Sequence, residues 1–175
     1  MDRSKRPGDH ECSEYYRDYI ALVPDGDIDS TLDDQLQHAL EFLRSIAAEQ
    51  FEVIHPPYDW TIRTVVQHCC DVERVFGYRA LRFASGDEID LPGWDQNFYA
   101  VCGHCDLTSK EELAEEFAAL RRANLRLLHR LEPSAFDRFG MADGKKVSVR
   151  TIFWLMAGHW IHHEKVLRVR LQPAS

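Results

Sequence analysis

The stretch that decides the fold is Ala157-Gly158-His159-Trp160-Ile161-His162-His163-Glu164. It lies within residues 148–171, where apolar residues recur every three or four positions, the period of an α-helix that buries one face. His159 and His163 are four residues apart, so both project from the same face of that helix. This face is otherwise the apolar stripe, so the sequence predicts that both imidazoles point inward, beside Ile152, Met156 and Val166.

Three more segments have the same periodicity, and the sequence predicts helices over about 29–50, 61–84 and 110–131. Their starts, and that of the last helix, are marked by residues that commonly cap helix N-termini: Ser30 with Asp33, Ser109 with Glu112, and Ser148. The chain of 175 residues is long enough for one domain with a sizeable core. We therefore predict an all-α, four-helix bundle.

The segments between these helices determine the predicted topology. We expect residues 1–27 to form a polar arm that packs on the bundle, and residues 28–175 to form the single bundle domain. The connection over 85–108 is long enough to travel the length of the bundle, which allows the second and third helices to be parallel. Residues 132–147 are predicted to be a loop with a turn or short hairpin between 140 and 146.

A third histidine, His68, lies on the apolar stripe of the second helix, beside Val65 and Val72. At about 1.5 Å per residue, His68 is roughly 10 Å from the start of its helix and His163 roughly 12 Å from the end of the last one. The three histidines therefore lie at the same height along the bundle axis only if the second and fourth helices are antiparallel. With parallel second and third helices, this arrangement predicts an up-down-down-up bundle.

Three imidazoles in a bundle interior need partners, because an unpaired buried polar group is costly. One divalent metal ion satisfies all of them, and three protein ligands leave a coordination position open, as in catalytic sites. A chance His-x3-His pair beside an ordinary hydrogen-bonded core histidine is the alternative. His162 points about 60° away from His159, so we place it outside the ligand set.

Charge and hydropathy exclude several other classes of function. The formal net charge is −8, which disfavours nucleic acid as a partner. No apolar run approaches the roughly 18–20 residues that span a bilayer, and the polar N-terminus lacks a signal-peptide core, so we expect a cytoplasmic protein. The five cysteines are expected to be reduced. Cys102-Gly-His-Cys105 is a Cys-x-x-Cys motif, but it lacks the βαβ context of a redox pair and is half of a structural zinc site.

The sequence resembles the DinB/YfiT-like superfamily in three places: the segment Trp60–Arg79 around His68, Leu91-Pro-Gly-Trp-Asp95, and the Gly158-His159-x3-His163 helix. The resemblance covers roughly residues 14–171. It implies an up-down-down-up four-helix bundle, often a homodimer, that holds zinc, nickel or a similar ion through His68, His159 and His163. Related proteins include proteins described as metal-dependent hydrolases, bacillithiol or mycothiol S-transferases, and thiol-dependent maleylpyruvate isomerases.

Further residues are singled out near the predicted site. Asp71 is a candidate to orient a ligand imidazole by a hydrogen bond, or alternatively an ion-pair partner of Arg74 or Arg79. Trp94 and Asp95, in the crossover, are candidates to cover the metal. Four residues also match the family pattern and are expected to form ion pairs that anchor helix ends and loops: Glu73, Arg79, Arg82 and Asp95.

Together these observations predict a divalent-metal-dependent enzyme that activates a thiol or water for a small-molecule substrate. A low-molecular-weight thiol is the expected co-substrate if the reaction is thiol transfer. The alternative is a metal-binding or ligand-sensing bundle without turnover.

Overall fold

The computed structural model describes residues 5–102 and 107–172. Four long helices form the bundle: α2 (Ile28–Ser45), α4 (Ile62–Ala84), α6 (Lys110–Arg130) and α7 (Val149–Arg170). The shorter elements are η1 (Asp9–Glu11), α1 (Glu14–Ala21), α3 (Ala48–Phe51), α5 (Gln96–Cys102), η3 (Pro133–Asp137), β1 (Phe139–Ala142) and β2 (Lys145–Ser148). The predicted fold class is therefore confirmed, with a two-stranded sheet as a minor addition.

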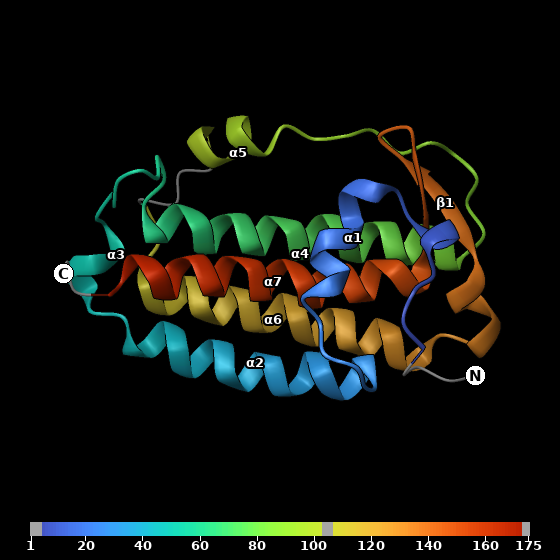
Figure 1. The fold of residues 1–175 in the computed structure, drawn as a ribbon, viewed down its shortest axis with the longest axis horizontal. Coiled ribbons are helices and arrows are strands. Elements are labelled where there is room, and N and C mark those ends of the chain that lie inside the picture. The colour runs from blue at the N-terminus through green and yellow to red at the C-terminus, as the bar shows by residue number, and fades with distance from the viewer. Residues whose placement is uncertain (1–4, 103–106, 173–175) are drawn as a thin grey trace.

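The bundle has the predicted up-down-down-up topology (Figure 1). Helices α2 and α7 run in one direction, and α4 and α6 run in the other. The chain leaves the end of α4, returns along the outside of the bundle through α5, and enters α6 at the end where α4 began. Because α4 and α7 are antiparallel, the geometric requirement for bringing His68 level with His159 and His163 is met.

A small hairpin holds the start of the crossover in place. Strands β1 and β2 pair antiparallel, which confirms the hairpin predicted between the last two long helices. Leu91 of the crossover adds a parallel bridge to Ala142: its amide donates to the Met141 carbonyl and its carbonyl accepts from the Asp143 amide, both at 2.9 Å. This pairing fixes the backbone three residues before Trp94.

The first long helix differs from its prediction at both ends. It begins at Ile28 because Asp27, the last residue of the predicted arm, is the N-cap and accepts a hydrogen bond from the Ser30 amide at 3.0 Å. It ends at Ser45 because the backbone of Ile46 is extended, and the Ile46 carbonyl accepts a hydrogen bond from Lys110 at 2.8 Å. The predicted helix over 29–50 is thus two helices, and the expected Ser30–Asp33 capping box was wrong.

This assignment of the cap is testable. Asp27→Ala should lower the free energy of unfolding by about 1 kcal/mol, because it removes the acceptor that satisfies a free helical amide. Ser30→Ala should change the free energy by a few tenths of a kcal/mol, since it is a helix-surface substitution. Urea unfolding of both variants would measure this difference. A larger loss for Ser30→Ala would restore the sequence-based assignment.

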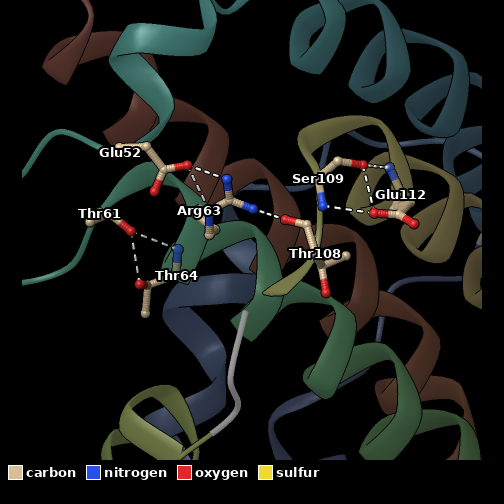
Figure 2. A network of polar contacts seen from close by, with 7 residues as sticks. All are labelled: Glu52, Thr61, Arg63, Thr64, Thr108, Ser109 and Glu112. Atoms are coloured by element: carbon tan, nitrogen blue, oxygen red, sulfur yellow. Dashed lines mark hydrogen bonds and ion pairs between the residues drawn. The ribbon is translucent and has the colours of Figure 1, made fainter. Parts of the chain in front are cut away.

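The starts of α4 and α6 are joined at one end of the bundle (Figure 2). Thr61 caps α4 by accepting from the Thr64 amide at 3.0 Å, and Ser109 forms with Glu112 the capping box predicted for α6. Arg63 binds both Glu52, at the end of α3, and the Thr108 carbonyl, just before α6. This cluster fixes the end of the crossover against the start of α4.

A buried polar network joins all four long helices near the histidines. The Arg121 guanidinium, with 0% of its side chain exposed, donates to Glu73 at 2.7 and 3.0 Å and to Gln35 at 2.7 Å. Arg121 also donates to the Met156 carbonyl at 3.3 Å, and Gln35 donates to the Ala157 carbonyl at 3.1 Å. The network therefore holds the backbone of α7 immediately before Gly158 and His159.

Within the described residues, every helix is too short or too polar to cross a membrane.

Candidate metal centre

The structure brings the three predicted histidines together inside the bundle. The Nε2 atom of His159 lies 3.0 Å from Nε2 of His68 and 3.1 Å from Nε2 of His163. One ligand nitrogen from each residue lies within 4.8 Å of the other two. His68 comes from α4 and the pair from α7, as the antiparallel arrangement requires.

The three rings are held in the neutral form that binds metal. Burial lowers the pKa of His68 to about 4, and the neighbouring His162 adds to this shift. Burial, with repulsion from His68, lowers the pKa of His163 to about 3. Burial also lowers the pKa of His159, and the nearby His163 has the same effect. Each ring therefore has a nitrogen lone pair available at neutral pH.

Hydrogen bonds among the three rings cannot account for both short distances at Nε2 of His159. A neutral imidazole nitrogen has one in-plane site, either a proton or a lone pair, so Nε2 of His159 cannot form two linear hydrogen bonds. Imidazole nitrogens bound to zinc at about 2.0–2.1 Å are themselves about 2.9–3.4 Å apart for coordination angles of 90–110°. The observed spacings of 3.0 and 3.1 Å fall in this interval, so the residues fit a shared divalent ion.

Of the predicted covering residues, Trp94 contacts a histidine directly. Its ring stacks on His68, with centroids 5.8 Å apart and planes inclined by 16°. Asp95 instead accepts hydrogen bonds from the amides of Asn97 and Phe98 at 3.0 and 3.1 Å, which begins α5. The crossover thus covers the histidines with the tryptophan, while the aspartate shapes the turn beside it.

Asp71 lies on a neighbouring face of α4. It accepts a hydrogen bond from Gln67 at 3.2 Å and pairs with Arg74 at 3.4 Å, which is the ion-pair alternative. Nδ1 of His68 is buried and has no hydrogen-bond partner among the described residues. The structure therefore does not bring Asp71 to the imidazole that it was predicted to orient.

His162 lies outside the cluster, as expected, with its ring against His163 and Tyr19. Cys69 and Cys70 are buried, and burial raises the pKa of both thiols, which disfavours the reactive thiolate. Cys102 is a free, exposed thiol. Its motif partner Cys105 lies outside the described residues.

Sequence reasoning missed three aromatic rings around the histidines. The Trp60 centroid lies 5.3 Å from that of His68, and Tyr19 and Phe76 lie 5.8 and 6.4 Å from His159. Trp60 and Phe76 belong to the family-like segment, but Tyr19 comes from the N-terminal arm. Tyr19 was detectable only as one of several aromatics in an otherwise polar segment.

Gly158 explains how the arm reaches the site. Helix α1 packs across α7, and a Cβ atom placed on Gly158 would lie 2.1 Å from the Tyr19 carbonyl oxygen. Only glycine allows this approach, which brings the Tyr19 ring over His159. Gly158, which immediately precedes His159, therefore allows helix α1 to pack over that histidine.

Gly158→Ala should therefore destabilise the protein by about 1–3 kcal/mol, because the backbone of α1 must move away from the new methyl group. The sign is diagnostic, since helix propensity alone predicts that this change stabilises a helix interior by about 1 kcal/mol. Thermal unfolding would measure stability, and limited proteolysis would report release of the arm. A more stable variant with a protected arm would contradict this account.

A cavity of about 390 Å³ adjoins the histidines. It is lined by residues of α1, α4, α7, the crossover and the hairpin, and His159 is one of them. Its lining includes Tyr16, Tyr19, Phe76, Arg79, Trp94 and His159. A ligand in this space would lie beside a metal ion bound to the three imidazoles.

Comparisons with known proteins agree with this architecture. YfiT from Bacillus subtilis, described as a probable metal-dependent hydrolase with an unusual four-helix bundle topology, is 16% identical, with a TM-score of 0.66 over 95% of this chain and 93% of that one. A mycothiol-dependent maleylpyruvate isomerase is 13% identical, with a TM-score of 0.67 over 89% of this chain and 64% of that one. At these identities the likeness shows the fold alone.

Sequence comparisons identify the family. No curated protein sequence matches the chain significantly. The family model of the DinB superfamily matches residues 31–167, from the first turn of α2 to the last turn of α7, and so includes His68, His159 and His163. The chain therefore belongs to the DinB superfamily.

Proposed function

We propose that the protein is a metal-dependent enzyme that uses a thiol or water as its nucleophile. The observation that carries the proposal is the convergence of three neutral imidazole nitrogens on one point, beside a cavity large enough for a small substrate. Zinc and nickel are the metals proposed, since imidazole ligands suit both. A site with three protein ligands keeps a position free for a reacting group.

Each part of the site has a distinct role in this proposal. His68, His159 and His163 would hold the ion, which supplies charge that lowers the pKa of a thiol or water in the cavity. Trp94 and Tyr19 lie against the histidine rings and exclude bulk water from them. The cavity would hold the electrophilic substrate against the nucleophile.

Thiol transfer is favoured over hydrolysis by the carboxylates of the cavity. Two aspartates line it, Asp95 and Asp143. Asp95 accepts hydrogen bonds from two backbone amides, and Asp143 pairs with Lys145. Among the described residues neither carboxylate forms a hydrogen bond with a histidine of the cluster, so neither is placed beside the metal position as a general base for water commonly is. A metal-stabilised thiolate is already a strong nucleophile and needs no such base.

The structural neighbours include both water-dependent and thiol-dependent chemistry. One structural neighbour is described as a probable metal-dependent hydrolase and the other as a mycothiol-dependent isomerase. The engaged carboxylates also support a second candidate, a metal-binding or ligand-sensing module without turnover. The two candidates differ in a single measurable property, which is catalysis by the metal-loaded protein.

The test uses untagged protein loaded separately with zinc and nickel. Thiol transfer is followed as consumption of monochlorobimane in the presence of glutathione, cysteine, bacillithiol or mycothiol, and hydrolysis with p-nitrophenyl acetate. We expect thiol-dependent consumption that requires metal and disappears in His159→Ala. Stable metal binding without activity in either assay would support the metal-binding module and contradict the enzyme. Failure to bind metal would overturn both candidates.

A further inference from the structure

The cavity beside the histidines contains a buried arginine that lacks a carboxylate partner. Arg79 of α4 is 5% exposed and lines the cavity. Its hydrogen bond to the Pro92 carbonyl is 3.4 Å long, against about 2.7–2.9 Å for a strong charge-assisted bond. Among the described residues it forms no ion pair. A buried guanidinium in this state is a strong candidate to bind an anion.

Of the other three residues expected to form anchoring ion pairs, two do so. Glu73 pairs with Arg121, Arg82 pairs with Asp87, and Asp95 caps the turn into α5. Arg79 is the cation of this group that forms no ion pair among the described residues. Its charge is therefore not explained by anchoring a helix end or a loop.

The two cavity carboxylates form no ion pair with Arg79 among the described residues. Asp143 pairs with Lys145, and Arg79 makes only the weakest contribution to lowering the pKa of Asp143. One carboxylate oxygen of Asp95 accepts hydrogen bonds from two backbone amides. Burial raises the pKa of Tyr16, an effect that the adjacent Arg79 partly offsets, so this phenol stays neutral at physiological pH. Tyr16 therefore offers a hydroxyl group near the guanidinium but no counter-charge.

Arg79 and His68 lie on the same face of α4. They are eleven residues apart, about three turns or roughly 16 Å along the helix, and helical side chains lean toward the N-terminus, here toward His68. Val72 and Phe76 lie between them and also line the cavity. The cavity thus has the histidines at one end, an apolar middle and a cationic group at the other end.

We propose that Arg79 forms an anion subsite that binds a carboxylate of the substrate or of the thiol co-substrate. The favoured ligand class is a molecule with a reactive end, an apolar body and a terminal carboxylate. The planar guanidinium suits a carboxylate because it can donate two parallel hydrogen bonds. The assignment of the reactive end rests on the proposed function, whereas the subsite itself rests on Arg79.

The experiment compares two thiols that differ only at their far end, 6-mercaptohexanoate and 6-mercapto-1-hexanol. Isothermal titration calorimetry measures their binding to zinc-loaded protein. We expect the carboxylate to bind about 10- to 100-fold more tightly, the ratio that charge-assisted hydrogen bonds provide. Arg79→Met should abolish this ratio without weakening the alcohol. Arg74→Met, which removes the same charge outside the cavity, should preserve the ratio.

Arg79→Lys is a second variant that keeps the test valid if Arg79→Met does not fold. Circular dichroism measures the helical content of both variants. Arg79→Lys keeps the charge but loses the planar fork, so the ratio should fall only partly. Equal binding of the two thiols to the wild type, or a ratio that survives Arg79→Met, would overturn the subsite while leaving the metal centre intact. If the protein takes up no zinc, hexanoate is tested by thermal shift. A rise in the unfolding temperature with hexanoate that is absent in Arg79→Met would then support the subsite although the proposed function had failed. If hexanoate does not raise the unfolding temperature of the wild type, the subsite is overturned too.

Discussion

His159→Ala is expected to lower bound zinc from about one ion per chain to less than about a tenth, because a three-ligand site that loses one ligand retains little affinity. His159 has the largest expected effect of the three, since its Nε2 atom lies 3.0–3.1 Å from the corresponding atoms of both other histidines. Elemental analysis of untagged protein after exhaustive dialysis measures the metal directly. Thiol-dependent turnover should disappear with the metal.

His162→Ala is the matched control for this experiment. It removes an imidazole from the same helix, three residues away, that packs against the His163 ring but does not belong to the three grouped ligands. We expect wild-type zinc content in this variant. Equal zinc content in wild type, His159→Ala and His162→Ala would show that the metal is bound elsewhere, and the proposed function would fail. Loss of zinc in His162→Ala alone would mean that the ligand set was chosen wrongly.

The main features of the fold were predictable because they depend on local and periodic signals. Four helical stripes and the caps at Ser109 and Ser148 are local features, and the structure confirms them. The length of the crossover over 85–108 allowed parallel α4 and α6. The hypothesis of a shared metal site required the three histidines to lie at the same height along the bundle axis, and so predicted antiparallel α4 and α7. The structure has this arrangement.

The errors arose where a distant part of the chain decides between local options. Asp27 and Ser30 are both good caps, and local sequence does not distinguish them. The break after Ser45 depends on Lys110, which binds the Ile46 carbonyl from a helix 64 residues away in sequence. The contact of Tyr19 with Gly158 and the unpaired state of Arg79 are likewise properties of packing, which periodicity does not encode.

The second large effect is expected at the ion pair between Glu73 and Arg121. Glu73→Gln should lower the free energy of unfolding by about 3–5 kcal/mol, because it leaves the Arg121 guanidinium buried without its counter-charge. Arg121 is fully buried, so solvent cannot compensate for the loss. Urea unfolding followed by circular dichroism measures the change. Glu116→Gln is the control, since its partially exposed pair with Arg74 should contribute no more than about 1 kcal/mol.

A double variant separates the loss of a favourable pair from the exposure of an unpaired charge. Glu73→Met combined with Arg121→Met removes both charges, so it should be more stable than Glu73→Met alone, as buried pairs replaced by apolar side chains often are. Zinc affinity should nevertheless fall in the double variant, because Arg121 also donates to the Met156 carbonyl and so helps to hold α7 just before His159. Recovery of stability together with unchanged zinc affinity would contradict this positioning role. The network would then support the bundle without orienting the histidines.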